Sequence, residues 1–197
     1  MKLDENINYI VSGLERSGTS MVMQILLAGG APVVFDNSRR TDQNNPKGYY
    51  ELEGGKIINK LIDGTFPLDE HKGKFIKITS YGLKYLPAGK YKIIYSERNI
   101  EEILDSMEKM ADIKDTERDE TRESFIKLNS MIKNYIRDRE DVGVLLINYN
   151  NILSDPSTNI KKIYDFLGLA DINLEKMIDA VDKKLYRQKR NLKKNIK

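Results

Sequence analysis

Short apolar runs alternate with amphipathic stretches along most of the chain. Residues 142–147 form a continuous apolar run, which is typical of a central strand buried on both faces. Ile103, Leu104, Met107 and Met110 instead recur at the spacing of one helix face. By these criteria the sequence predicts strands at residues 6–11, 31–35, 75–78, 91–96 and 142–147, and helices at about 18–28, 52–62, 99–110, 125–136 and 155–167.

Predicted strands alternate with predicted helices, which is typical of a mostly parallel sheet covered by helices on both faces. The predicted fold class is therefore α/β, with three layers around a central sheet. Asn99 is a predicted helix N-cap with Glu102 as its capping-box partner, and Gly168 is a predicted helix stop. No internal repeat or linker divides the sequence. We expect one domain over residues 1–197, with a basic and partly loose tail from about residue 183.

Composition excludes several classes of function. The chain has 33 Lys and Arg against 30 Asp and Glu, a net charge of +3, which argues against a nucleic-acid partner. It has no cysteine, so disulfides, thiol catalysis and cysteine-based zinc sites are excluded. No basic leader with an apolar core opens the sequence, and no apolar run approaches the roughly 18 residues of a membrane span. We expect a cytoplasmic protein without a membrane span.

The strongest motif is the segment Gly13-Leu14-Glu15-Arg16-Ser17-Gly18-Thr19-Ser20, between a predicted strand and a predicted helix. Its two glycines have the spacing of a P-loop, in which successive backbone N–H groups point at an anion. The N-terminus of the following helix favours negative charge, and Thr19 and Ser20 add hydroxyl donors. The alternative is a glycine-rich turn without a ligand. The motif makes the expected fold similar to that of P-loop NTPases.

The loop departs from the nucleotide-hydrolase pattern at one position. Thr19 stands where that pattern has lysine after the second glycine, and the cation is Arg16 instead. Nucleoside triphosphate chemistry normally needs that lysine and a carboxylate that holds magnesium. Asp36, after the predicted strand at 31–35, could supply the carboxylate. A nucleotide kinase or hydrolase therefore stays open as an alternative.

Residues 14–20 resemble the 5′-phosphosulfate loop of sulfotransferases, usually Pro-Arg/Lys-Ser-Gly-Thr-Ser/Thr, with the arginine form of the tyrosylprotein and bacterial branches. Glu15 replaces the usual proline. The resemblance implies a sulfuryl donor, 3′-phosphoadenosine-5′-phosphosulfate (PAPS), with the product PAP and no metal. It assigns the donor's 5′ end to the following residues: Arg16, Ser17, Gly18, Thr19 and Ser20.

The resemblance extends to about residue 168 in separate blocks. Sulfotransferases bind the 3′-phosphate with an arginine and a serine at the separation of Arg98 and Ser106, and residues 147–153 resemble the family's Tyr-Glu-Asp-Leu stretch. The resemblance places Tyr149 near the adenine. The alternative for Arg98 is an ion pair with Glu101 or Glu102. The family's glycine-rich C-terminal motif is missing. The basic run from Lys183 to Arg190 could substitute for it, but such a run is more often a solvated tail.

Sulfuryl transfer also needs a group that accepts the acceptor's proton. The only histidine, His71, lies in a polar turn and matches no motif, so we expect a surface residue. The segment 45–51 resembles the Asn-Pro-x-Gly-Tyr/Phe-x-Glu segment of bacterial sulfotransferase-like proteins, which makes Glu51 the first candidate base. The alternative role of Glu51 is to favour a helix N-terminus. Asp36 is the second candidate base, and Lys47 is a candidate contact to the substrate or sulfate.

The sequence thus predicts a sulfotransferase that moves the sulfuryl group of PAPS to a hydroxyl or amine. Nothing in residues 36–50 or 111–122 distinguishes a small-molecule, sugar, lipid or peptide acceptor, and no feature indicates the oligomeric state. Two alternatives stay open: the P-loop kinase or hydrolase, and a non-catalytic protein that binds a phosphorylated ligand.

Overall fold

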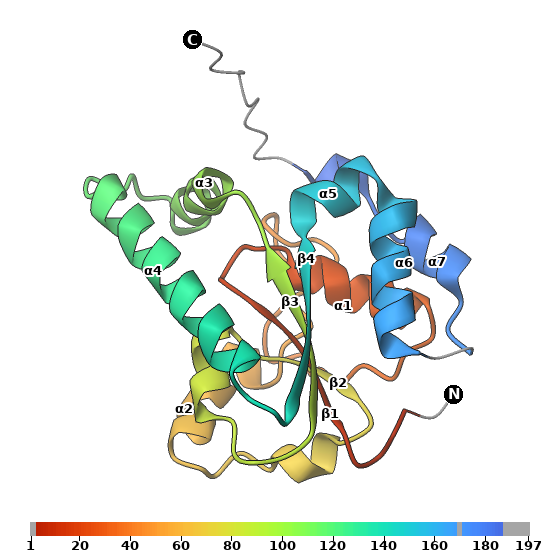
Figure 1. The fold of residues 1–197 in the computed structure, drawn as a ribbon. Helices are drawn as coiled ribbons and strands as arrows, with labels where there is room; N and C mark the ends of the chain where they lie inside the picture. Colours follow the sequence, from red (N-terminus) through yellow and green to blue (C-terminus); the bar gives the residue numbers. More distant parts are fainter. Residues whose placement is uncertain (1–2, 169–170, 187–197) are drawn as a thin grey trace.

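The computed structural model describes residues 3–168 and 171–186. Its centre is a parallel sheet with the strand order β2-β1-β3-β4 (Figure 1). The strands are β1 (Asn8–Gly13), β2 (Phe75–Lys77), β3 (Tyr91–Glu97) and β4 (Val142–Asn148). Ile10 of β1 lies opposite both Ile76 and Ile93, in the middle of the sheet.

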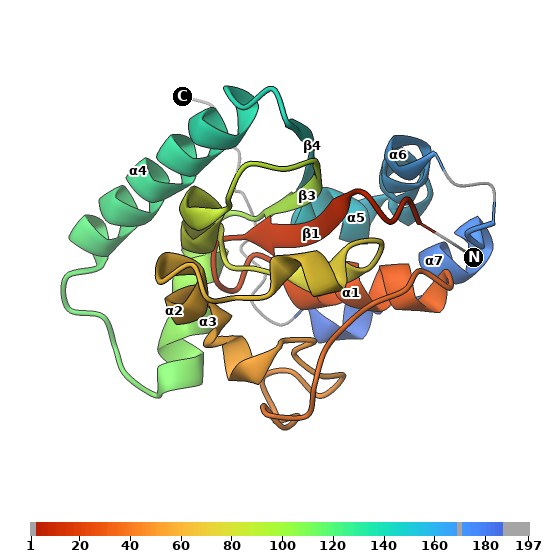
Figure 2. The same ribbon diagram turned by 90° about the horizontal axis from the view of Figure 1, so that it is seen from below.

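Helices cover both faces of the sheet, because successive side chains of each strand point to opposite sides. Tyr9 and Val11 pack into one apolar cluster and Ile10 into the other. Two separate views show α1, α6 and α7 on one side of the strands and α2 and α4 on the other (Figures 1 and 2). The predicted three-layer α/β fold is confirmed. The α-helices are α1 (Thr19–Ala28), α2 (Ile57–Ile62), α3 (Ile100–Ala111), α4 (Arg118–Arg137), α5 (Tyr149–Ser154), α6 (Pro156–Leu167) and α7 (Leu174–Asp179).

Short 3₁₀ helices complete the described chain: η1 (Glu53–Gly55), η2 (Leu68–His71), η3 (Ser80–Tyr85) and η4 (Lys183–Leu185). Lys183 and Lys184 of the predicted basic tail belong to η4, whereas residues 187–197 lie outside the described residues. Within residues 3–168 and 171–186, no helix combines the length and the apolar character that a membrane crossing requires.

The carboxyl ends of the parallel strands meet at one edge of the sheet. The loop after β1 leads into α1, the end of β3 leads into α3, and β4 leads directly into α5. This edge is uppermost in Figure 1, where α3 and α5 begin. The candidate residues of the sequence motifs are therefore brought together from distant parts of the chain.

The predicted strand at 31–35 is wrong in extent. Only Val33 forms an isolated parallel bridge, to Phe75. The Phe75 N–H donates to the Pro32 carbonyl oxygen and the Val34 N–H donates to the Phe75 carbonyl oxygen. The next donor along the segment, the Asp36 N–H, bonds to Glu51 instead of β2, so the ladder ends after one bridge.

The predicted helix at 52–62 is interrupted. Gly54 and Gly55 have φ values of 62° and 86°, in the left-handed region where a right-handed helix cannot continue. A 3₁₀ turn therefore precedes α2, which begins only at Ile57.

Other helix ends also differ from the predictions. The helix predicted at 125–136 begins earlier, at Arg118, and Arg118 forms ion pairs with Glu101 and Asp105 of α3. Helices α5 and α7 were not predicted. Asn99 caps α3 as expected, but its own N–H is donated to Asn150 Oδ1 rather than to Glu102.

Candidate functional site

The loop between β1 and α1 requires glycine at both positions of the motif. Gly18 is the N-cap of α1 and has a φ of 99°, and a Cβ there would lie 2.3 Å from Cδ2 of Tyr149. A Cβ on Gly13 would lie 2.3 Å from the carbonyl oxygen of Ser96. Both distances are too short for any side chain. The backbone of the loop is thus packed tightly between the ends of β3 and β4.

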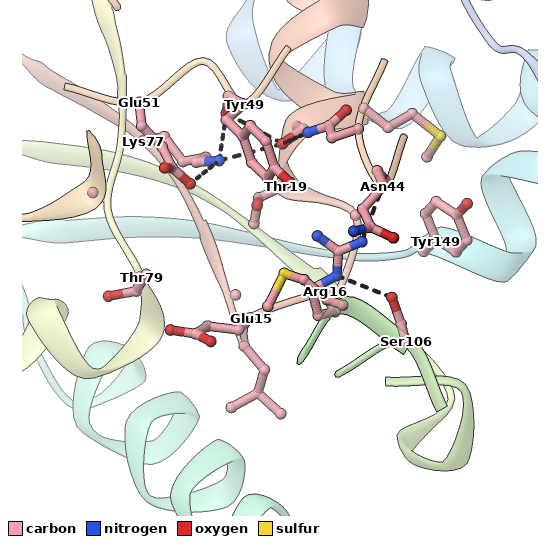
Figure 3. A pocket seen from close by; sticks show the side chains of 18 of the residues that line it. Glu15, Arg16, Thr19, Asn44, Tyr49, Glu51, Lys77, Thr79, Ser106 and Tyr149 are labelled. Atoms are coloured by element: carbon pink, nitrogen blue, oxygen red, sulfur yellow. Dashed lines mark hydrogen bonds and ion pairs between the residues drawn. The ribbon is translucent and has the colours of Figure 1, made fainter. Parts of the chain in front are cut away.

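A cavity of about 270 Å³ opens at this loop, at the carboxyl edge of the sheet (Figure 3). Its walls come from the loop, from residues 39–55, from the ends of β2 and α3, and from the C-terminal segment. The candidate residues that line it are Arg16, Gly18, Thr19, Ser20, Glu51, Arg98, Ser106 and Tyr149. Most of the predicted site residues therefore line one cavity.

Arg16 crosses the cavity from the loop to α3. It has a φ of 63°, which is uncommon for a residue with a side chain. Its Nε donates to Ser106 Oγ at 2.9 Å, and its Nη2 donates to the Asn44 carbonyl oxygen at 3.4 Å (Figure 3). Two residues that the sequence assigned to opposite ends of the donor therefore contact each other directly.

Arg98, at the end of β3, supports the loop from behind. Its Nη1 donates to the Arg16 carbonyl oxygen at 3.2 Å. Its Nε lies 3.0 Å from Oε2 of Glu102, and the two side chains are only 8% and 2% exposed. The Tyr149 ring centroid lies 4.6 Å from the guanidinium carbon. Arg98 therefore forms the ion pair with Glu102 that the sequence left open, and it also lines the cavity.

A buried lysine that the sequence analysis missed lies beside Glu51. Lys77, the last residue of β2, lines the cavity with its ammonium 2.8 Å from Glu51 Oε1 and 3.3 Å from Ser20 Oγ. Burial lowers the pKa of Lys77, and the negative charge of Glu51 opposes this shift. The available signal was a lone lysine within the apolar run Phe75-Ile76-Lys77-Ile78.

Glu51 has a second cationic partner, which was also missed. Nη1 of Arg39 lies 3.1 Å from Glu51 Oε2, and the guanidinium of Arg39 stacks 3.5 Å above the Tyr49 ring. The two carboxylate oxygens of Glu51 are therefore divided between Lys77 and Arg39 (Figure 3 labels Glu51, Lys77 and Tyr49).

The Asn45–Glu51 segment packs directly against the start of α1. Asn45 Nδ2 donates to Ser20 Oγ at 3.0 Å, and Ser20 Oγ donates to the Tyr49 carbonyl oxygen at 3.2 Å. The Tyr49 hydroxyl donates to Asp42 Oδ2 at 2.7 Å. Two motifs that are separate in the sequence thus form one wall of the cavity.

Ser17 lies on the other side of the loop. It is fully buried, and its hydroxyl has no hydrogen-bond partner among the residues described. It lines a second cavity of about 220 Å³, together with Glu97 and Lys133, rather than the first one. Its backbone is held by Ser96, whose hydroxyl donates to the Ser17 carbonyl oxygen at 2.8 Å.

Asp36 and His71 lie away from the first cavity. The Asp36 carboxylate accepts the backbone N–H groups of Ser38 and Glu53, both at 2.7 Å, and hydrogen bonds from these two residues lower the pKa of Asp36. His71 stacks on Phe66 with 5.4 Å between ring centroids. Burial lowers the pKa of His71. Neither side chain is among the described residues that line the cavity.

The C-terminal segment closes one side of the cavity. Asp182 and Leu185 line it, and Asp182 Oδ2 lies 2.9 Å from Lys47 Nζ. This ion pair joins the loop that contains Lys47 to the segment that leads into η4. Lys47 thus contacts the protein's own carboxylate at the rim. Over residues 3–168 and 171–186, no group of three or more His, Cys, Asp or Glu residues is arranged to hold a metal ion.

Comparison with known proteins agrees with this geometry. The family model described as "Sulfotransferase domain" matches residues 6–196. No curated protein sequence matches the chain. Among solved structures, the sulfotransferase domain of the Synechococcus PCC 7002 olefin synthase is similar, with a TM-score of 0.52 and 16% identity over 90% of this chain and 78% of that chain.

A second solved structure, mouse sulfotransferase SULT7A1 complexed with PAP, has a TM-score of 0.48 and 19% identity, and the match covers 91% of this chain and 64% of that chain. At such identities the cyanobacterial structure supports the fold alone, whereas the family model spans nearly the whole sequence. On that match, and with the loop, Arg98 and Ser106 around one cavity, the chain belongs to the sulfotransferase domain family.

Proposed function

We propose that this protein transfers the sulfuryl group of PAPS to a hydroxyl or amine of an acceptor. The observation that carries the proposal is the convergence of three cations, Arg16, Lys77 and Arg98, on one cavity beside the glycine-bounded loop. PAPS carries negative charge on its 5′-phosphosulfate and its 3′-phosphate. Charge-assisted hydrogen bonds from fixed cations are the strong contacts for such groups.

The positions of the three cations suggest how the donor lies. The loop, Arg16 and Lys77 would hold the 5′-phosphosulfate, since the N-terminus of α1 and the buried ammonium face the same space. Arg98 and Ser106 would hold the 3′-phosphate, and Tyr149 would lie beside the adenine. Arg98 lines the cavity while Glu102 and the Arg16 carbonyl oxygen hold its Nε and Nη1, which supports this assignment.

In the transfer, the acceptor oxygen or nitrogen forms a bond to sulfur while the bond from sulfur to the bridging phosphate oxygen breaks. The electron pair of that bond stays on PAP, whose added negative charge Arg16 and Lys77 would stabilise. Such fixed charge in a partly buried site is usually a large contribution to catalysis. The acceptor's proton must leave at the same stage.

We assign Glu51, the carboxylate in contact with Lys77, as the group that accepts this proton. Both of its oxygens are occupied, so it must release one partner before it binds a proton. Arg39 is the more exposed partner, at 37%, against 6% for Lys77. In this proposal an incoming acceptor displaces Arg39, while Lys77 stays in place. Asp36 remains a weaker candidate, because two backbone N–H groups already bind its carboxylate.

The nucleotide preference tests the proposal first. PAP should raise the melting temperature without magnesium, because a ligand that binds only the folded state adds about 2.7 kcal/mol at one hundred times its dissociation constant. The measurement is a thermal-shift series with PAP, PAPS, ATP and GTP, each with and without magnesium. Stabilisation by ATP only with magnesium, and none by PAP, would instead support the kinase or hydrolase.

The second test separates the two ends of the donor. Arg98→Ala should weaken PAP much more than adenosine 5′-phosphosulfate, because only PAP carries the 3′-phosphate. Loss of a charge-assisted contact costs about 2 kcal/mol, or roughly thirtyfold in the dissociation constant. Both ligands should lose some affinity, since Arg98 also supports the Arg16 carbonyl oxygen.

Isothermal titration with both ligands gives the ratio of the two losses. Arg137→Ala is the matched control, since Arg137 is exposed at the end of α4 and should change neither affinity. Equal losses for the two ligands in Arg98→Ala would show that Arg98 does not bind the 3′-phosphate.

A further inference from the structure

The C-terminal segment places a tyrosine hydroxyl against a buried carboxylate. Tyr186 follows η4 directly, and its hydroxyl donates to Oε1 of Glu102. The same hydroxyl accepts Nδ2 of Asn150 at 2.8 Å. Tyr186 thus connects the end of the described chain with α3 and α5.

Glu102 is the residue that these contacts hold in place. It is 1% exposed, so an ionised carboxylate here needs partners for both oxygens. Oε2 lies 3.0 Å from Arg98 Nε and 2.9 Å from Asn150 Nδ2, and Oε1 accepts the Tyr186 hydroxyl. Arg98, Asn150 and Tyr186 therefore share one buried carboxylate.

The ring of Tyr186 also limits where Arg98 can lie. The guanidinium carbon of Arg98 is 4.6 Å from the Tyr149 ring centroid and 5.9 Å from that of Tyr186. The two rings meet edge to face, with 5.8 Å between centroids. An arginine side chain has many rotamers, and ordering it on ligand binding costs free energy. Two rings and one carboxylate order it beforehand.

We propose that Tyr186 is a positioning residue, which holds Arg98 in the orientation that binds the donor by fixing Glu102. The inference rests on the proposed function only for the identity of the ligand. The hydroxyl fixes the rotamer of Glu102, Glu102 fixes Nε of Arg98, and Nη1 of Arg98 then reaches the Arg16 carbonyl oxygen of the loop. Tyr186 itself need not touch the ligand.

Tyr186→Phe tests the proposal, because it removes only the hydroxyl and keeps the ring. Removing the hydroxyl that donates to this buried carboxylate disturbs Glu102, so the dissociation constant for PAP should rise about tenfold. That for adenosine 5′-phosphosulfate should change less than about twofold, since it lacks the group that Arg98 binds. Tyr135→Phe is the matched control. The Tyr135 hydroxyl donates to the Lys84 carbonyl oxygen, and neither residue is among those described that line the cavity. An unchanged affinity for PAP would overturn the proposal.

A measurement without nucleotide keeps the proposal separate from the proposed function. Phenylglyoxal modifies accessible arginines, and peptide mass spectrometry gives the rate at Arg98. This rate should rise in Tyr186→Phe and stay unchanged in Tyr135→Phe. If the wild-type protein binds neither nucleotide, the proposed function fails, and the modification rate alone decides whether Tyr186 positions Arg98. An equal rate in wild type and Tyr186→Phe would overturn the positioning role.

A double-mutant cycle distinguishes this route from a separate effect of Tyr186. If the hydroxyl acts through Glu102, Tyr186→Phe should change the Arg98 modification rate little once Glu102→Gln is present. If the two effects add fully, Tyr186 acts on the cavity by another route, and the proposal is wrong.

Discussion

Glu51→Gln is expected to slow sulfuryl transfer by roughly 10²–10⁴-fold, the usual contribution of a positioned proton acceptor. The amide keeps the shape of the side chain and an oxygen for Lys77 or Arg39, so PAPS affinity should change little. The experiment needs an acceptor, so a screen with labelled PAPS over phenols, sugars, lipids and peptides comes first. Single-turnover rates with the acceptor found then separate chemistry from product release.

Two further variants make the Glu51 result specific. Glu53→Gln is the matched control, since Glu53 pairs with Lys60 at 2.6 Å and does not line the cavity within the described chain. It should keep the wild-type rate. Asp36→Asn should also keep most of the rate. If Asp36→Asn abolishes transfer while Glu51→Gln does not, the proton acceptor is Asp36. If Glu51→Gln loses PAPS binding, Glu51 supports the donor site instead.

Lys77→Met should have the second largest effect, with a loss in rate of roughly 10²–10³-fold from removal of a fixed charge at the reacting group. Methionine has a similar volume, so the packing of β2 should survive. PAPS binding should also weaken, because in the proposed function the ammonium holds the 5′-phosphosulfate of the donor before transfer as well. A fall in the single-turnover rate at saturating PAPS would separate the catalytic contribution from binding.

The control for Lys77 lies on the same segment. Lys74→Met removes an exposed positive charge one residue before β2, so it tests whether net charge alone weakens the donor. It should leave the rate unchanged. Equal loss in the two variants would mean that long-range attraction, rather than a contact in the cavity, explains the effect of Lys77.

The strands were predictable because they are apolar, but the prediction that residues 142–147 form a central strand buried on both faces is wrong. β4 lies at the edge of the sheet, and only Ile147 of it is buried. Residues 91–96 and 142–147 were predicted as strands, and both lie inside β3 and β4. Residues 31–35 are equally apolar, but an edge strand continues only while its alternate N–H groups bond to the neighbouring strand. The Asp36 N–H is donated to the Glu51 carbonyl oxygen instead. An apolar run indicates a segment that packs against the core, whereas the length of a strand depends on hydrogen-bond partners that are distant in sequence.

The position of the glycine-bounded loop between β1 and α1 was predictable because its signal is local. Its glycines, Arg16 and the start of α1 lie within eight residues of one another, from 13 to 20. Lys77 and Arg39 could not be assigned in this way. A lysine in a strand is normally exposed, and only the fold shows that Lys77 ends β2 beside Glu51. Tyr186 was missed because its partners lie on α3 and α5.

The contacts that complete the cavity join very distant parts of the chain. Arg16 and Ser106 are 90 residues apart, Arg98 and the Arg16 carbonyl are 82 apart, and Tyr186 and Glu102 are 84 apart. Contacts of such long range form late in folding, after the chain has lost most of its loop entropy. A partly folded chain in which only local helices have formed lacks both the pairing of β1 with β3, which is itself long-range, and the walls of the cavity. Nucleotide binding should therefore report the last stage of folding. During refolding, PAP binding should recover more slowly than the helical circular-dichroism signal.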